Sequence, residues 1–139
     1  MNTKIYKSVH DLAEQLMKAA FKEDVDLFET LYSELKAICI DNENTEKDHP
    51  VQWETLADFT ENLDDALISY AKALEKASTI NSKDHMSSIA FSMAKFQAEL
   101  GQTDAAIKNL QDAKISANKI GDKELKNEIH ELLESLLDP

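Results

Sequence analysis

The side chains that could perform chemistry in this chain are few and far apart. None of the histidines forms the His-Glu-x-x-His pair that a zinc protease requires; they are His10, His49, His85 and His130. Glu46 and His49 have the spacing found in carboxylate-bridged metal helices, but the pair occurs once and lies in a polar segment. We therefore expect no metal site and no cofactor.

Nucleophilic catalysis has equally little support in the sequence. Cys39 is the only cysteine, and it lies between Ile38 and Ile40 at the end of an apolar stripe. A thiol in such a setting is expected to be buried and inert, because a reactive one needs a base or a positive charge beside it. Neighbouring carboxylates such as Asp64 and Asp65 are ordinary on a solvated helix face. With no phosphate-binding loop or triad spacing, the sequence predicts that the protein is not an enzyme.

The charge of the chain limits its partners. The formal net charge is −12, and all 15 basic residues are lysines. Nucleic-acid binding depends on clustered Lys and Arg, so we expect no nucleic-acid partner. The first residues lack the unbroken apolar stretch of a signal peptide or membrane span, and a single cysteine forms no internal disulfide, so we expect a cytoplasmic protein without a membrane partner. Solubility explains the acidity, although a basic partner is an alternative.

The elements that position these residues are predicted to be helices throughout. The chain has only two glycines and two prolines, and its apolar residues recur at steps of three and four. The polar run 41–48 is expected to be a loop, with Pro50 in the first turn of the next helix. We predict one all-α domain spanning 1–139, with about seven helices: hairpins over approximately 3–40, 48–80 and 83–120, and a capping helix over 122–137.

The second half of the chain repeats itself after 40 residues. Side-chain size is the same, small or large, in four pairs of matched positions: Ala66 with Ala106, Tyr70 with Leu110, Ala73 with Ala113, and Ala77 with Ala117. Alanines at this spacing allow two helices to cross closely, while the larger residue fills the adjacent gap. Hairpins of this kind must stack to bury their faces, so a short right-handed α-solenoid is expected.

The repeat extends imperfectly to the beginning of the chain. With an offset of 38 residues, Phe28 occupies the position of Ala66 and Tyr32 that of Tyr70. Phe28 is unusually large for a helix crossing. Trp53 shares a helical face with Leu56, so we expect its ring in the core rather than at an interface.

The repeated residues resemble the tetratricopeptide repeat. Leu100-Gly101-x-x-x-x-Ala106-x-x-x-Leu110-x-x-Ala113 follows the spacing of that family's turn and second helix. The unit of about 40 residues is longer than the family's common form of 34. In this respect it resembles the variety of the family with longer helices. Trp53-Glu54 departs from the family pattern in the first helix of its unit. A HEAT-type helical repeat, of similar length, is the structural alternative.

The resemblance implies a concave groove, lined by the first helices of successive hairpins, that binds a peptide. Phe91 lies between Ile89 and Met93, so burial of those two is expected to turn Phe91 toward this groove. Apolar contact is expected from Val51, Phe59 and Phe91, and charge pairing from Lys95, Asp58 and Glu99. The full predicted groove consists of Val51, Thr55, Asp58, Phe59, Phe91, Lys95, Ala98 and Glu99.

Three hypotheses for function follow. The first is a non-catalytic module that binds a protein or peptide in the groove. The second is an acidic chaperone or inhibitor that covers the basic surface of a dedicated partner. The third is self-assembly into a homodimer through an exposed end of the stack.

Overall fold

The computed structural model describes residues 2–138, and every regular element in this range is an α-helix. This confirms the predicted all-α fold. The helices are α1 (Thr3–Phe21), α2 (Val25–Asp41), α3 (Pro50–Asp58), α4 (Leu63–Thr79), α5 (Lys83–Glu99), α6 (Thr103–Ala117) and α7 (Lys123–Leu137).

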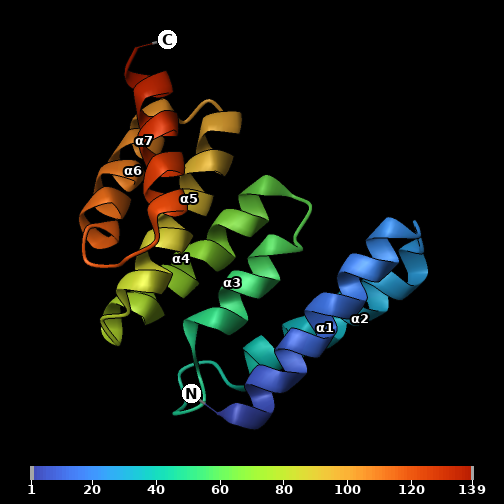
Figure 1. The fold of residues 1–139 in the computed structure, drawn as a ribbon. Coiled ribbons are helices and arrows are strands. Elements are labelled where there is room, and N and C mark those ends of the chain that lie inside the picture. The colour runs from blue at the N-terminus through green and yellow to red at the C-terminus, as the bar shows by residue number, and fades with distance from the viewer. Residues whose placement is uncertain (1, 139) are drawn as a thin grey trace.

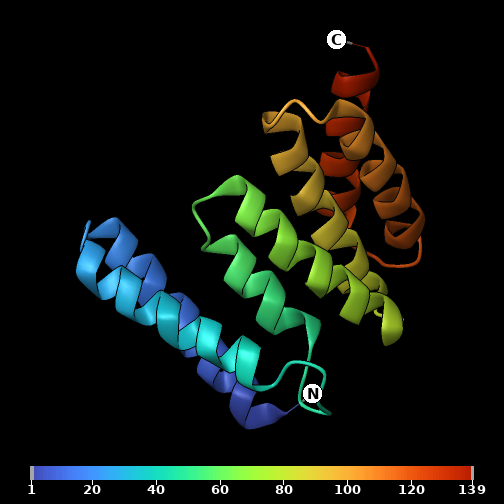
Figure 2. The same cartoon turned by 180° about the vertical axis from the view of Figure 1, so that it is seen from behind.

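Successive helices pair as hairpins that stack along the chain, followed by the final helix α7 (Figure 1). Helix α4 packs on α5, and α7 packs on both α6 and α5. Among the helices, the first hairpin touches the rest of the stack only through α3. The view from behind shows this hairpin standing apart from the other five helices (Figure 2).

Local sequence signals account for most helix ends. Five N-caps are Asn, Asp or Ser, the residue types that typically cap helices, such as Asp24, whose carboxylate accepts the Leu27 backbone amide at 3.2 Å. At the C-termini of α1, α4 and α5, the chain reverses through residues with positive φ, namely Glu23 at 57°, Asn81 at 54° and Gly101 at 77°. This left-handed conformation closes the last turn and directs the chain into the next helix.

The repeated alanines lie at the tight helix crossings. Ala66, Ala73 and Ala77 of α4 are at most 1% exposed, as are their counterparts Ala106, Ala113 and Ala117 of α6. Tyr70 and Leu110 fill equivalent buried positions between them. The 40-residue repeat in the sequence is therefore also a repeat of packing.

Asp48 organises the polar loop that precedes α3. Its carboxylate accepts the Trp53 indole N–H at 2.9 Å and the Asn44 amide at 2.7 Å, and it pairs with Lys76 at 3.2 Å. Trp53 is 3% exposed, so its predicted place in the core is confirmed. These contacts fix where α3 begins.

Helix α5 is buried on two faces, which corrects the expectation for Phe91. Ile89 and Met93 belong to a core cluster shared with α1–α4, whereas Phe91 belongs to a second cluster with residues of α6 and α7. The Phe91 ring is only 8% exposed. The prediction that it faces an open groove is wrong. Because α5 lies between two layers of helices, it buries Phe91 on one side as well as Ile89 and Met93 on the other.

Helix α3 is much shorter than its neighbours. It has 9 residues, compared with 17 in each of α2 and α4. Phe59 and Thr60, directly after α3, contact Phe28 and Tyr32 of α2. The end of α3 and the turn that follows it therefore reach the N-terminal half of α2.

Candidate binding site

The residues predicted to form the groove lie on α3, at its C-cap and on α5, and they differ in how far they are buried. Val51 and Thr55 of α3 are half-buried, and the Thr55 hydroxyl donates to the Val51 carbonyl at 2.6 Å. Ala98 is half-buried against the second core cluster, and Glu99 is exposed. The site prediction as a whole stays a prediction, apart from the corrected position of Phe91.

Two predicted charged residues lie close to aromatic side chains. Lys95 is exposed, and its Nζ lies 4.9 Å from the centroid of the Phe91 ring. Asp58 is exposed as a residue, but its carboxylate accepts the Tyr70 hydroxyl and is partly withdrawn from water. This desolvation raises the pKa of Asp58, and the Tyr70 hydrogen bond opposes the rise. Both charges therefore have partners within the protein.

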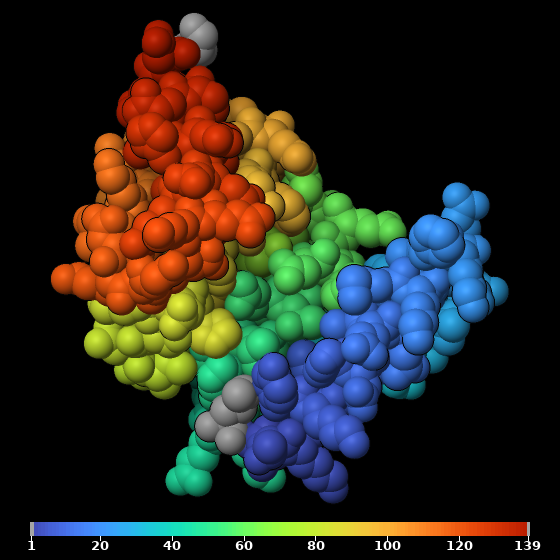
Figure 3. Space-filling model, viewed as in Figure 1, coloured from blue at the N-terminus to red at the C-terminus, as the bar shows by residue number. Residues whose placement is uncertain are grey.

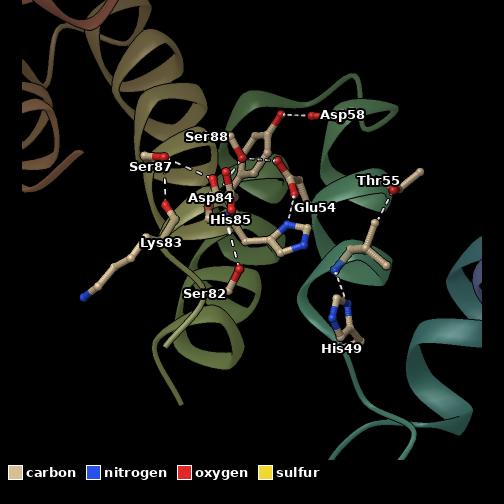
Figure 4. Close-up of polar contacts among 12 residues, drawn as sticks. His49, Glu54, Thr55, Asp58, Ser82, Lys83, Asp84, His85, Ser87 and Ser88 are labelled. Carbon is tan, nitrogen blue, oxygen red and sulfur yellow. Dashed lines mark hydrogen bonds and ion pairs between the residues drawn. The ribbon is translucent and has the colours of Figure 1, made fainter. Parts of the chain in front are cut away.

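A polar cluster that the sequence did not predict joins α3 to α5. Figure 4 shows Glu54 extending from α3 toward His85 and Ser88 of α5. The Glu54 carboxylate lies 3.3 Å from His85 Nδ1 and accepts the Ser88 hydroxyl at 2.9 Å. The hydrogen bond from His85 to Glu54 raises the pKa of the imidazole. Both carboxylate oxygens are occupied, so this cluster serves to hold two hairpins together.

His49 adds a second imidazole to this junction. Its ring centroid lies 5.4 Å from that of His85, and its Nδ1 accepts the Val51 amide at 3.1 Å, which caps α3. An accepting Nδ1 carries no proton. Burial, and then the nearby charge of His85, lowers the pKa of His49.

A hollow lies between the first hairpin and the α3–α4 turn. Figure 3 shows the surface indented between the blue helices and the green turn. The cleft has a volume of about 910 Å³ and is open to solvent. Of the predicted groove residues, only Phe59 contributes to it. Its apolar lining consists of Ala19, Ala20, Val25, Phe28, Tyr32 and Phe59.

Contacts between α2 and the α3–α4 turn form the base of this cleft. The Phe28 and Phe59 rings meet edge to face at 6.3 Å, and the Tyr32 hydroxyl lies 2.8 Å from Thr60 Oγ1. Because the Thr60 hydroxyl donates to the Leu56 carbonyl at 2.7 Å, Tyr32 donates to Thr60. The base is therefore fixed by side chains that are themselves well held.

The rim of the cleft is acidic. Its lining includes Glu23, Asp24, Glu29, Glu61 and Asp65, and no lysine or histidine. All five are exposed, and none forms an ion pair within residues 2–138. An apolar floor surrounded by unpaired carboxylates can accept apolar side chains together with positive charges.

The N-terminal repeat departs from the other two at the cleft. Ala66 and Ala106 are fully buried, whereas Phe28 in the matched position is half-buried at the cleft. The large residue in a small-residue position was visible in the sequence. The cleft around it was not, because it depends on how the second hairpin approaches α2.

Comparisons with protein-family models, curated proteins and solved structures give no match to this chain. Among residues 2–138, no three His, Cys, Asp or Glu side chains are grouped to hold a metal ion. In the same range, no helix is both long and apolar enough to span a bilayer.

Proposed function

We propose that this protein is a non-catalytic module that binds a segment of another protein. The observation that supports this most strongly is the cleft between the first hairpin and the α3–α4 turn. A hollow of about 910 Å³ with aromatic side chains on its floor has the size and chemistry of a binding pocket. The likeness to tetratricopeptide repeats, whose members bind peptides, is compatible with this proposal. A cytoplasmic location is part of the proposal and rests on composition alone.

The cleft replaces the predicted groove as the proposed site. Phe59, which was expected to supply apolar contact, lies in the cleft, whereas Phe91 is enclosed by the core. On the α3 and α5 surface, Glu54, Asp58 and Thr55 are occupied by partners within the chain. The cleft keeps apolar surface and free carboxylates available together.

A displayed library of random peptides tests the proposal. Peptides enriched on the wild-type protein are synthesised, and their affinities are compared with those for Phe59→Ala. Loss of a central aromatic contact should weaken binding by at least about tenfold. Ile115→Ala is the matched control, because Ile115 is an exposed apolar residue on α6, and it should leave affinity unchanged.

Two results would contradict the proposed function. One is that no peptide is enriched over a library panned without protein. The other is that enriched peptides bind Phe59→Ala as tightly as they bind the wild type. Circular dichroism of each variant shows whether it is folded, so that a loss of binding is not caused by unfolding.

The acidic chaperone or inhibitor is the alternative, and the net charge of −12 favours it. A protein that covers a broad basic surface by charge should lose affinity steeply with added salt. A protein that binds mainly through the apolar floor should lose little. The salt dependence of the enriched ligands therefore separates the two functions.

A further inference from the structure

We propose that the cleft accepts a short amphipathic helix of a partner protein, with an apolar stripe flanked by lysines or arginines. This inference rests on the proposed function and specifies the partner. It follows from the extent of the cleft along α2, from the pattern of side chains on α2, and from the charges around the cleft.

The cleft leaves space for added material along the start of α2. It has a volume of about 910 Å³, is open to solvent, and its lining on α2 runs from Val25 to Ser33. This stretch corresponds to about two and a half turns of α-helix. Phe59 and Thr60 close the base of the cleft against Phe28 and Tyr32, so a partner helix of two to three turns would lie over these side chains.

The face of α2 that lines the cleft has apolar residues at helical spacing. Val25, Phe28 and Tyr32 are spaced at i, i+3 and i+7, which places them along one face. Val25 is 64% exposed, and Phe59 extends the same apolar surface from the other side of the cleft. An amphipathic helix binds such a groove through apolar residues at matching intervals.

The charges around the cleft select a basic helix. Five carboxylates surround the apolar floor and no basic side chain is present in the lining. Asp24 also caps α2 through the Leu27 amide, so the other four acids are the main contacts for a partner. A second copy of this chain is disfavoured as the occupant, because each copy has a net charge of −12.

Three synthetic peptides of equal length test this inference by fluorescence anisotropy. The first has leucines at i, i+3 and i+7 with lysines at the other positions, the second replaces every lysine with glutamate, and the third scrambles the first. We expect the first to bind at least about tenfold more tightly than either of the others, since both the stripe and the positive charges contribute. Its circular dichroism should become more helical on binding.

A matched pair of variants locates the binding. In the first, Glu29→Gln, Glu61→Gln and Asp65→Asn neutralise three carboxylates of the cleft. In the control, Glu128→Gln, Glu131→Gln and Glu134→Gln remove the same charge from exposed positions on α7. The cleft variant should bind the lysine peptide at least about tenfold more weakly, and the α7 variant should bind it nearly as the wild type does. Thermal melting verifies that both variants are folded.

The outcomes separate this inference from the proposed function. If the scrambled lysine peptide binds equally well, or both triple variants weaken binding alike, general charge attraction explains the result and the helix proposal is overturned. If library peptides bind in a Phe59-dependent way but the lysine peptide has no advantage, the helix proposal fails while the proposed function stands. If Phe59→Ala affects no ligand, both fail. A stable dimer in light scattering that buries the cleft would also overturn the inference.

Discussion

At the scale of single residues, His49 and His85 respond to pH in opposite directions although their rings touch. The pKa of His85 is raised, so its contribution to stability is complete below the unfolded-state pKa of about 6.5 and is lost as pH rises through the folded-state value. The pKa of His49 is lowered, because the folded state favours the neutral ring. Its contribution is complete above the unfolded-state pKa and is lost as pH falls.

Substitution of each histidine should reveal these opposite signs. His85→Gln should destabilise the protein more at about pH 6 than at about pH 8.5, because only protonated His85 pairs with Glu54 as an ion. His49→Asn keeps a capping oxygen at the start of α3 and should gain stability relative to the wild type as pH falls. Urea denaturation at both pH values gives the free energies of unfolding.

Glu54→Gln is the control for the His85 result. It removes the charge that raises the pKa of His85, so its cost should also be larger at the lower pH. If His85→Gln costs the same free energy at both pH values, the Glu54 and His85 pair is not coupled to folding through protonation.

At the scale of helices, the alanines at the crossings control how closely the hairpins approach. Ala106 is 0% exposed, whereas Ala105, its neighbour in α6, faces solvent. Ala106→Leu should lower the free energy of unfolding by about 1–3 kcal/mol, because the added carbons have no space. Ala105→Leu should change it by less than about 0.5 kcal/mol. Equal denaturation midpoints for the two variants would show that the close crossing is not at Ala106.

The same elements show what sequence reasoning can and cannot reach. Periodicity depends on local spacing, so the stripe of Ala66, Tyr70 and Ala73 predicted a helix and its buried face. Phe91 was misplaced because a single buried face was assumed for its helix, whereas the packing of α6 and α7 gives α5 a second one. The cleft was missed because it depends on how the first two hairpins approach each other, which is a relation between hairpins and not a property of either.

At the scale of the whole molecule, two core clusters divide the stack unequally. Helices α1 to α5 contribute to one cluster, and α5 to α7 form the other, so α5 belongs to both. The first hairpin is attached through α3 alone among the helices. Regions with fewer packed neighbours open more readily, and we expect the first hairpin to separate before the rest of the stack unfolds. A ligand in the cleft would connect α2 to the α3–α4 turn and oppose this separation.

Cys39 makes that separation measurable without altering the protein. Its Sγ donates to the Gln52 carbonyl at 3.2 Å, so the thiol lies between α2 and α3. Burial, with smaller effects from the charges of Asp48 and Glu43, raises its pKa to about 12.

A disulfide reagent that forms a coloured product can reach this sulfur only when the hairpin moves away from α3. Labelling in buffer should be at least about a hundredfold slower than in urea, and slower again with the lysine peptide bound. Labelling at the urea rate would mean that the junction of the first two hairpins is open in solution most of the time.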